Sequence, residues 1–249
     1  MKKQLLILTT AFVTVAFVSC SKEKMEAPVA SQQSEEMTKP NSPSGPITIN
    51  PLSVGLLGRY EFNGTLKDTT GKLEDAWPAH GRYMFGPDRK GQANKALRFN
   101  GAYGMDIYDI PYTPDKASVS FWVKDDIIEG PAWYRMLGSS KAFVFQQSEY
   151  QFSCSFNKSG LIVQQVGTDP IDGNWHHVVG TRDNASMKLY IDGVLIGTTA
   201  SPVVDFGPSL LHNYSLAYVG GGFWKGSLDD VRFYKRVLSL SDIIALKNL

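Results

Sequence analysis

The sequence predicts an all-β fold that ends in one short helix, and three observations support this. After Leu52, short runs rich in β-branched and aromatic residues alternate with breaks of Gly, Pro, Asn and Asp, a spacing typical of a sandwich or a barrel. The pair Asp192-Gly193 separates two of these runs and is characteristic of a two-residue hairpin turn. Helical periodicity occurs only in the C-terminal stretch SLSDIIALKNL, residues 239–249, where a serine precedes the apolar positions as a helix cap.

The N-terminus differs in composition from the rest of the chain. Lys2 and Lys3 precede an apolar stretch from Leu5 to Val18, and a small residue stands directly before Cys20. This order predicts a signal peptide over residues 1–19 rather than a folded helix. It resembles bacterial lipoprotein signals, in which Cys20 would become the lipidated first residue of the mature chain.

Two neighbouring positions bear on that resemblance. Phe17 stands three residues before Cys20, where Leu is usual, and the alternative is a cleaved secretory peptide whose cysteine is incidental. Ser21, rather than Asp, follows the cysteine, which by resemblance favours the outer membrane over the inner one. We therefore expect a lipid-anchored protein of the cell outer membrane, on its periplasmic face or at the cell surface.

Residues 20–50 are expected to form a tether. This stretch is rich in Ser, Pro, Gln, Glu and Lys and has almost no aromatic residues, so it buries too little apolar surface to offset its chain entropy. A random coil of about thirty residues reaches roughly 25 to 35 Å. The remaining residues, 51–249, are predicted to form one folded domain.

Five stretches of this domain carry a resemblance to a known family. In chain order they are GRYEFNGTLKDTTG, GQANKALRFNGAYGMDI, ASVSFWVK, NWHHVVGTRDNASMKLYIDGVLIG and GFWKGSLDDVRFYKRVLSLSDI. They resemble the successive motifs of the laminin-G-like branch of the concanavalin A-like lectin/glucanase superfamily, over about residues 55–246. The resemblance implies a two-sheet antiparallel jelly-roll sandwich. Asn100 stands where the family often has Asp, and the segments Trp77–Phe85 and Asp125–Ser140 match no motif.

The adjacent pair His176-His177 is not expected to bind a metal. Successive side chains of a strand point to opposite faces, so the two rings do not converge on one ion. By resemblance, His177 occupies a scaffold position of the family. Cys154 lies in the alternating stretch FSCSF, where a small buried side chain is expected, and it leaves the mature domain without an internal disulfide.

Composition and motifs also argue against two functions, nucleic-acid binding and catalysis. The formal net charge is +1, and no basic stripe interleaved with aromatics is present, so nucleic acid is not an expected partner. The laminarinase-type glucanases of the superfamily carry their catalytic carboxylates as E-x-D-x-x-E on one strand, and this pattern is absent from the sequence. Beyond residue 50 no glutamate has an acidic residue two positions away, and we therefore predict that the protein is not an enzyme.

Asp229 is the strongest candidate for a metal ligand. It alternates with Val231 and Phe233 and is expected to face the core if they do, where a carboxylate needs a partner. One alternative is that Asp229, and likewise Asp68, accepts hydrogen bonds from the backbone amides of a nearby turn and so fixes that turn. The other is a structural Ca²⁺ ion, with Asn63 and Asp68 of the loop FNGTLKDTTG as further oxygen ligands.

Aromatic residues outside the family motifs are the candidates for ligand binding. The predicted ligand-binding residues are Trp133, Tyr134, Arg135, Trp77 and Tyr108. An exposed aromatic ring stacks on a sugar ring while neighbouring polar groups bind hydroxyls. The alternative is that these loop residues fold back onto the sandwich.

The sequence as a whole predicts a non-catalytic, lipid-anchored binding module of the cell envelope. Its expected ligand is a glycan or another extracellular polymer, and its contact with the membrane is through the anchor. Because a fold does not determine function, two alternatives remain: a carbohydrate-active hydrolase or lyase, and a surface adhesin that binds protein. The oligomeric state is not predicted.

Overall fold

The computed structural model describes residues 50–79, 82–111, 115–126, 134–139, 142–148, 151–156, 161–164, 172–200, 211–219 and 222–249. The signal peptide, Cys20 and nearly all of the tether lie outside these ranges and stay predictions. No helix within the described ranges is long and apolar enough to cross a membrane.

In this part of the chain, eight strands form one antiparallel sheet. They are β1 (Leu56–Tyr60), β3 (Met84–Gly86), β4 (Ala96–Asn100), β6 (Ala117–Asp125), β11 (His176–Arg182), β12 (Ser186–Ile191), β13 (Val194–Ala200) and β17 (Lys225–Tyr234). Their order across the sheet is β13-β12-β11-β6-β17-β4-β3, with β1 also paired to β17.

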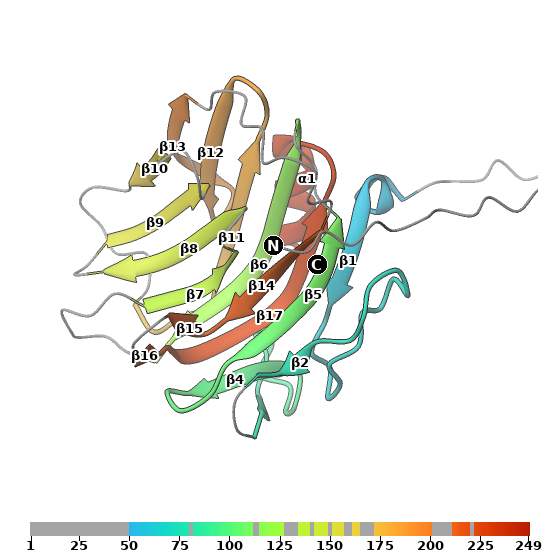
Figure 1. Ribbon diagram of the computed structural model, residues 1–249, viewed down its shortest axis with the longest axis vertical. Coiled ribbons are helices and arrows are strands. Elements are labelled where there is room, and N and C mark those ends of the chain that lie inside the picture. The colour runs from blue at the N-terminus through green and yellow to red at the C-terminus, as the bar shows by residue number, and fades with distance from the viewer. Residues whose placement is uncertain are drawn as a thin grey trace, which may run out of the picture. The chain divides into compact units, whose positions relative to one another are not determined.

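A second antiparallel sheet contains seven of the described strands. They are β2 (Trp77–Pro78), β5 (Met105–Pro111), β7 (Tyr134–Gly138), β8 (Phe143–Ser148), β9 (Gln151–Phe156), β10 (Leu161–Gln164) and β14 (Leu211–Leu216), in the order β10-β9-β8-β7-β14-β5-β2. A small ladder joins β15 (Tyr218–Val219) to β16 (Gly222–Phe223). The two sheets form the layers of a sandwich (Figure 1), and the predicted all-β, two-sheet architecture is confirmed.

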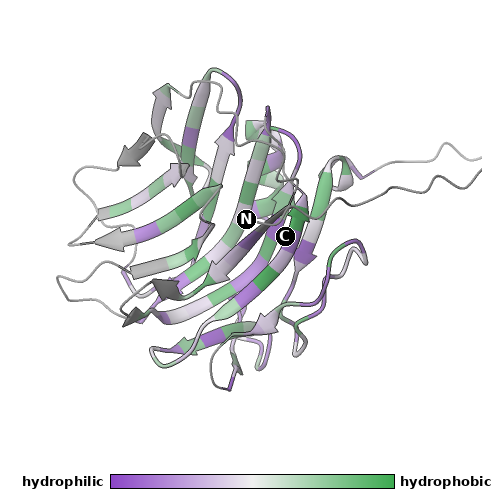
Figure 2. Ribbon diagram, viewed as in Figure 1, coloured by the Kyte–Doolittle hydropathy of each residue, from purple (hydrophilic) through white to green (hydrophobic). Residues whose placement is uncertain are grey.

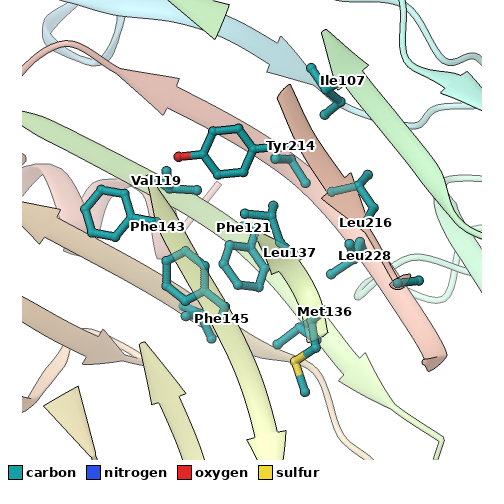
Figure 3. Packing of buried hydrophobic residues seen from close by; sticks show 14 of the residues in the cluster. Ile107, Val119, Phe121, Met136, Leu137, Phe143, Phe145, Tyr214, Leu216 and Leu228 are labelled. Atoms are coloured by element: carbon teal, nitrogen blue, oxygen red, sulfur yellow. The ribbon is translucent and has the colours of Figure 1, made fainter. Parts of the chain in front are cut away.

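The core lies between the two sheets and is rich in aromatic rings. Phe121 of β6 and Phe145 of β8 meet edge to face with their ring centroids 4.8 Å apart, and Tyr214 of β14 lies 4.8 Å from Phe233 of β17. Figure 3 shows Phe121, Phe145 and Tyr214 among the side chains that pack together in this core, and Figure 2 shows apolar and polar residues alternating along the strands. Cys154 is fully buried in the same cluster, as expected.

β17 organises the eight-stranded sheet. Its first half pairs with β4, its second half pairs with β1 on the same side, and β6 lies along its other side. The pairing with β6 shifts register between Asp229 and Arg232, and Asp230 has a φ of 47°. This is a β-bulge, which adds one residue to the strand and changes which face the following side chains occupy.

The predicted hairpin is present. β12 and β13 are joined by Asp192 and Gly193, with φ values of 51° and 82°. Two successive positive φ angles define the turn type that matches the right-handed twist of paired strands, which explains the choice of Asp and Gly.

The predicted C-terminal helix is also present, as α1 (Leu240–Lys247). The Ser239 hydroxyl accepts from the Asp242 amide while the Asp242 carboxylate accepts from the Ser239 amide, an arrangement that satisfies the first free amides of a helix. Ile243 and Leu246 are buried, but Ile244, also an apolar position of the predicted helix, is 45% exposed.

α1 covers part of the outer face of the eight-stranded sheet. Ile243 and Leu246 pack there with Val179 of β11 and Tyr234 of β17. The short 3-10 helix η1 (Pro51–Ser53) contributes Leu52 to the same cluster. A second, smaller core therefore lies outside the sandwich.

Candidate functional site

His177 has a structural role. It is 1% exposed, its Nε2 lies 2.9 Å from the Ser120 hydroxyl, and its ring packs on Trp122 at 5.3 Å between centroids. Burial lowers the pKa of His177 to about 4, so the ring is neutral at pH 7. Each of these contacts ties β11 to the neighbouring strand β6.

His176 has a different set of partners. Its Nδ1 lies 2.7 Å from the Asp192 carboxylate, and its Nε2 lies 3.1 Å from Asp172. The hydrogen bond to Asp192 raises the pKa of His176, although partial burial opposes it. The two histidines do not converge on a common point, in agreement with the sequence analysis, and among the described residues no group of three His, Cys, Asp or Glu side chains is arranged to hold a metal.

Trp77 stands on the outer face of the seven-stranded sheet. It lies on the edge strand β2 opposite Asp106 of β5, and it is 62% exposed. Met105 and Ile107, on either side of Asp106, are fully buried in the core, so Asp106 points outward. Residues directly opposite each other in an antiparallel pair share a face, so the side chains of Trp77 and Asp106 are neighbours on this outer face.

Two hydroxyl groups hold this carboxylate in place. Ser215 of β14 donates to Asp106 Oδ1 at 2.8 Å, and Tyr108 of β5 donates to Asp106 Oδ2 at 3.2 Å. Burial and the neighbouring Asp106 charge raise the pKa of Tyr108, so the phenol keeps its proton at neutral pH. We call Trp77, Asp106, Tyr108 and Ser215 the Trp77 site.

The Trp77 site combines a flat apolar surface with a fixed acceptor. A carboxylate has about four acceptor positions, and two of those on Asp106 take the hydroxyls of Ser215 and Tyr108. The described residues supply no further side-chain donor to Asp106, so its other acceptor positions are open to the hydroxyl groups of a ligand. An exposed indole beside such a group suits a ligand that has an apolar face and hydroxyl donors, which is the chemistry of a sugar ring.

The structure therefore brings together Trp77 and Tyr108, two of the five residues predicted to bind ligand. Tyr134 and Arg135 begin β7, which is separated from β5 by β14 in the same sheet. Trp133 lies outside the described residues. The roles of all five in binding stay predictions.

Asp68, predicted as a metal ligand, organises its own turn. Its Oδ1 accepts from the amides of Arg59 at 2.8 Å and Thr70 at 3.1 Å. Its Oδ2 accepts from the Thr70 hydroxyl at 2.7 Å and from the amides of Lys72 at 2.9 Å and Leu73 at 2.8 Å. Burial acts to raise the pKa of Asp68, but these hydrogen bonds lower it below its ordinary value. Five donors on one carboxylate correspond to the turn-fixing alternative.

Asp229 is buried as expected, but it does not face the core with Val231 and Phe233. It forms an ion pair with Arg89, whose guanidinium also lies 5.0 Å from the centre of the Trp122 ring. The bulge at Asp230 accounts for the difference, because one extra residue reverses the alternation along the strand. Its partner among the described residues is therefore the Arg89 guanidinium rather than a turn amide. Burial raises the pKa of Asp229 to about 7, against the opposing charge of Arg89.

Asp229 borders a charged pocket of about 390 Å³ on the outer face of the eight-stranded sheet. The acidic residues lining it are Glu61, Asp88, Asp229 and Asp230. Asp230 accepts from Arg232 through both carboxylate oxygens and from Arg59 Nε at 2.9 Å. Burial acts to raise the pKa of Asp230, and the two arginines lower it below its ordinary value.

The three predicted calcium ligands do not converge. Asn63 and Asp229 line the charged pocket, whereas Asp68 does not. Asn63 donates to Glu61 at 3.0 Å, and the carboxylates of Asp68 and Asp229 are engaged by amides and by a guanidinium. As a set they do not fit one calcium ion.

Sequence reasoning missed three residues of these two regions. Asp106 could have been found from the sequence, because the run MDIYDI alternates apolar and polar residues around it. Ser215 lies 109 residues from Asp106, and Arg89 lies 140 residues from Asp229. No local pattern indicates such pairs.

A laminin G family model, described as the concanavalin A-like lectin/glucanases superfamily, matches residues 99–244 of the chain. No curated protein matches the sequence.

Several solved structures share the fold. Domain 4 of AbnA, an extracellular GH43 arabinanase from Geobacillus stearothermophilus solved with arabinotriose, superimposes with a TM-score of 0.66 at 22% identity, covering 77% of this chain and 98% of that domain. The binding domain of botulinum neurotoxin DC, in complex with rat synaptotagmin II, gives 0.64 at 15% identity over 78% of this chain and 51% of that one. A type C botulinum neurotoxin structure, described as dependent on two ganglioside molecules for cell entry, gives 0.61 at 15% identity.

This chain spans about half the length of the neurotoxin chains and nearly all of the arabinanase domain. The family match covers more than half of the 249 residues, in the region that forms most of both sheets. The chain belongs to the laminin G-like branch of the concanavalin A-like lectin/glucanase superfamily.

Proposed function

We propose that this protein is a non-catalytic saccharide-binding module and that the Trp77 site contacts the sugar. The observation that carries the proposal is a 62% exposed tryptophan directly opposite Asp106, whose carboxylate is fixed by two hydroxyls. Leaving an indole in water is unfavourable, and covering it with a ligand recovers that free energy. The fixed carboxylate then orients the ligand through its hydroxyl groups.

The relatives support binding rather than a particular ligand. The arabinanase domain was solved with arabinotriose, one neurotoxin structure is described by its interaction with gangliosides, and another contains a protein receptor. Saccharide binding thus agrees with two of these three neighbours. If the protein binds no saccharide, a protein ligand, as expected of an adhesin, is favoured instead.

A glycan array probed with the full-length protein tests the proposal. We expect binding to at least one saccharide class, and a loss of about tenfold or more in Trp77→Ala, because covering a tryptophan contributes roughly 1.5 to 3 kcal/mol. Val194→Ala is the matched control, since Val194 is 61% exposed on β13 of the other sheet. Absence of binding to every saccharide contradicts the proposal, as does equal loss in both variants.

A hydrolase is a second candidate, and the charged pocket is the observation that favours it. Four carboxylates face one cavity, and burial raises the pKa of Asp229 to about 7, which is suitable for a general acid near neutral pH. Against it, Asp229, Asp230 and Glu61 are each paired with an arginine. Release of reducing ends from a saccharide that binds, abolished by Asp229→Asn, would establish this function in place of the first.

We further propose that Cys20 carries a lipid anchor that places the protein at the outer membrane. The support is the charged, apolar and small residues that precede Cys20 in the sequence. Mass spectrometry of the N-terminal peptide, with Cys20→Ser as the control, is expected to show an acylated cysteine at position 20. A soluble wild-type protein cleaved elsewhere contradicts the anchor.

A structural calcium ion stays a prediction, and a ligand set other than Asn63, Asp68 and Asp229 would have to hold it. A bound ion stabilises the folded state by mass action, so its removal lowers the melting temperature. Thermal unfolding of the full-length protein with calcium and with a chelator tests this. An unchanged melting temperature argues against a structural ion.

A further inference from the structure

The Trp77 site carries the negative charge of Asp106, and this charge bears on whether a neutral or an acidic sugar binds there. Asp106 forms no ion pair among the described residues, and its two hydrogen-bond donors, Ser215 and Tyr108, are both neutral. Among the residues that the structure describes, no cation is paired with this carboxylate. A partly buried carboxylate of this kind attracts hydroxyl donors and repels a second carboxylate.

The strands that form the site carry further negative charge. β2, β5 and β14 contain two aspartates, Asp106 and Asp109, and no lysine or arginine. Asp109 is exposed and follows Tyr108 directly, and its amide is held by the Asn213 side chain at 3.3 Å. Both fixed charges of these strands are thus negative.

The nearest arginine on a neighbouring strand lies farther along the sheet. Arg135 begins β7, three residues before Gly138, which stands opposite Ser215. At about 3.3 Å per residue its backbone is roughly 10 Å farther along the strand direction, and β7 is three strands away from β2, roughly 14 Å across the sheet. The backbone of Arg135 is therefore well removed from that of Trp77 in the sheet.

We propose that the Trp77 site selects uncharged saccharides over acidic ones and that Asp106 determines this selectivity. This inference rests on the proposed saccharide-binding function. A sugar that covers the indole places its substituents within about 5 Å of the residue opposite Trp77. Two like charges 4 to 5 Å apart in water repel enough to weaken binding by about fivefold, and by more where the ligand excludes water.

Matched pairs of oligosaccharides test this selectivity. Tetrasaccharides of glucose and glucuronate, galactose and galacturonate, and mannose and mannuronate differ only in the oxidation of C6. For any pair that binds, we expect the neutral member to bind wild-type full-length protein at least about fivefold more tightly. We expect higher ionic strength to narrow the difference, because salt screens exposed charges.

The variant Asp106→Asn identifies the residue responsible. Asparagine keeps the shape of the side chain and an oxygen that accepts from Ser215, but it removes the charge. We expect the preference to fall by about fivefold, mainly through tighter binding of the acidic member. Asp115→Asn is the control, because Asp115 is an exposed acid just before β6 of the other sheet and its removal leaves the preference unchanged.

The outcomes separate the two proposals. Equal binding of neutral and acidic members by the wild type overturns the selectivity while leaving saccharide binding in place. A preference that survives Asp106→Asn overturns the role of Asp106. If no member of any pair binds, and the wider array is also negative, saccharide binding itself is overturned and the selectivity with it.

Discussion

The ring of His176 lies 2.7 Å from the carboxylate of Asp192, the first residue of the turn between β12 and β13. The other oxygen of Asp192 accepts from the His177 amide at 2.9 Å, and Lys247 of α1 donates to the Asp192 carbonyl at 2.9 Å. A single aspartate therefore connects the start of β11, the hairpin and the C-terminal helix.

This contact predicts a pH-dependent contribution to stability. The hydrogen bond to Asp192 raises the pKa of His176 above its ordinary value of 6.5, and the pKa of Asp192 is lowered. The stabilisation by this contact is therefore complete just below pH 6.5 and is lost as the pH rises through the raised pKa of His176. It is also lost in strong acid, where the pH falls through the lowered pKa of Asp192 and the carboxylate is protonated. We therefore compare the free energy of unfolding of the wild type with that of His176→Gln at two pH values. We expect the wild type to exceed the variant by more at pH 5.5 than at pH 8.5, and the change to be less than about 1 kcal/mol because solvent screens the contact.

Chemical denaturation at the two pH values measures this difference. Subtracting the variant removes the opposite effect of His177, whose pKa is lowered to about 4 by burial. The same difference at both pH values would show that the ring of His176 acts only by packing.

Gly180 of β11 is predicted to tolerate no side chain. A Cβ atom there would lie 2.7 Å from Cζ of Phe145 and 3.2 Å from the Cys154 sulfur, both in the main core. Overpacking of this kind costs about 1 to 3 kcal/mol, so we expect Gly180→Ala to lower the free energy of unfolding by that amount. Gly86→Ala is the control, because its nearest contacts are 3.4 Å away on the flexible side chain of Arg98. Recovery of stability in Gly180→Ala with Phe145→Leu would identify the clash as the cause.

Sequence patterns predicted those features that depend on neighbouring residues. The Asp192-Gly193 turn and the Ser239 cap require only two to four consecutive residues, and the succession of family motifs predicted the two-sheet fold. The face of the sheet on which the Asp229 side chain lies could not be predicted in the same way. It depends on the bulge at Asp230, which exists because β17 changes register against β6, and register is a property of two distant strands.

The candidate site shows the same division. Trp77 and Tyr108 were predicted to bind ligand because they are aromatic residues outside the family motifs. The structure places them on adjacent strands of one sheet. Ser215, which holds the Asp106 carboxylate together with Tyr108, comes from a third strand. Its role follows only from the strand order β14-β5-β2.

Asp230 and Glu61 are predicted to differ sharply in their contributions to stability. Asp230 is 6% exposed and pairs with the buried Arg232 and with Arg59, so Asp230→Asn leaves a buried guanidinium without its counter-charge. Such a loss costs about 3 to 5 kcal/mol. Asparagine also tolerates the positive φ at this position, which separates the charge effect from backbone strain.

Glu61 provides the comparison on the same network. Its ion pair with Arg59 spans 2.6 Å, but both side chains are about a third exposed, and pairs of that kind contribute about 0 to 1 kcal/mol. Denaturant unfolding of Glu61→Gln beside Asp230→Asn measures the contrast. Equal losses in the two variants would mean that burial does not govern this network.

Asp68→Asn distinguishes a turn-fixing aspartate from an ion ligand. The substitution removes the acceptor that the Lys72 and Leu73 amides share on Oδ2, and leaving such donors unsatisfied costs about 1 to 3 kcal/mol. Because hydrogen bonds lower the pKa of Asp68, the wild-type advantage is present above its ordinary pKa of 3.8 and is lost as the pH falls through the lowered value. We expect the same loss of stability with calcium and with a chelator, measured by thermal and denaturant unfolding at pH 7. A loss seen only with calcium would instead make Asp68 a ligand, since only then does the missing carboxylate remove the stabilisation that a bound ion gives to the folded state.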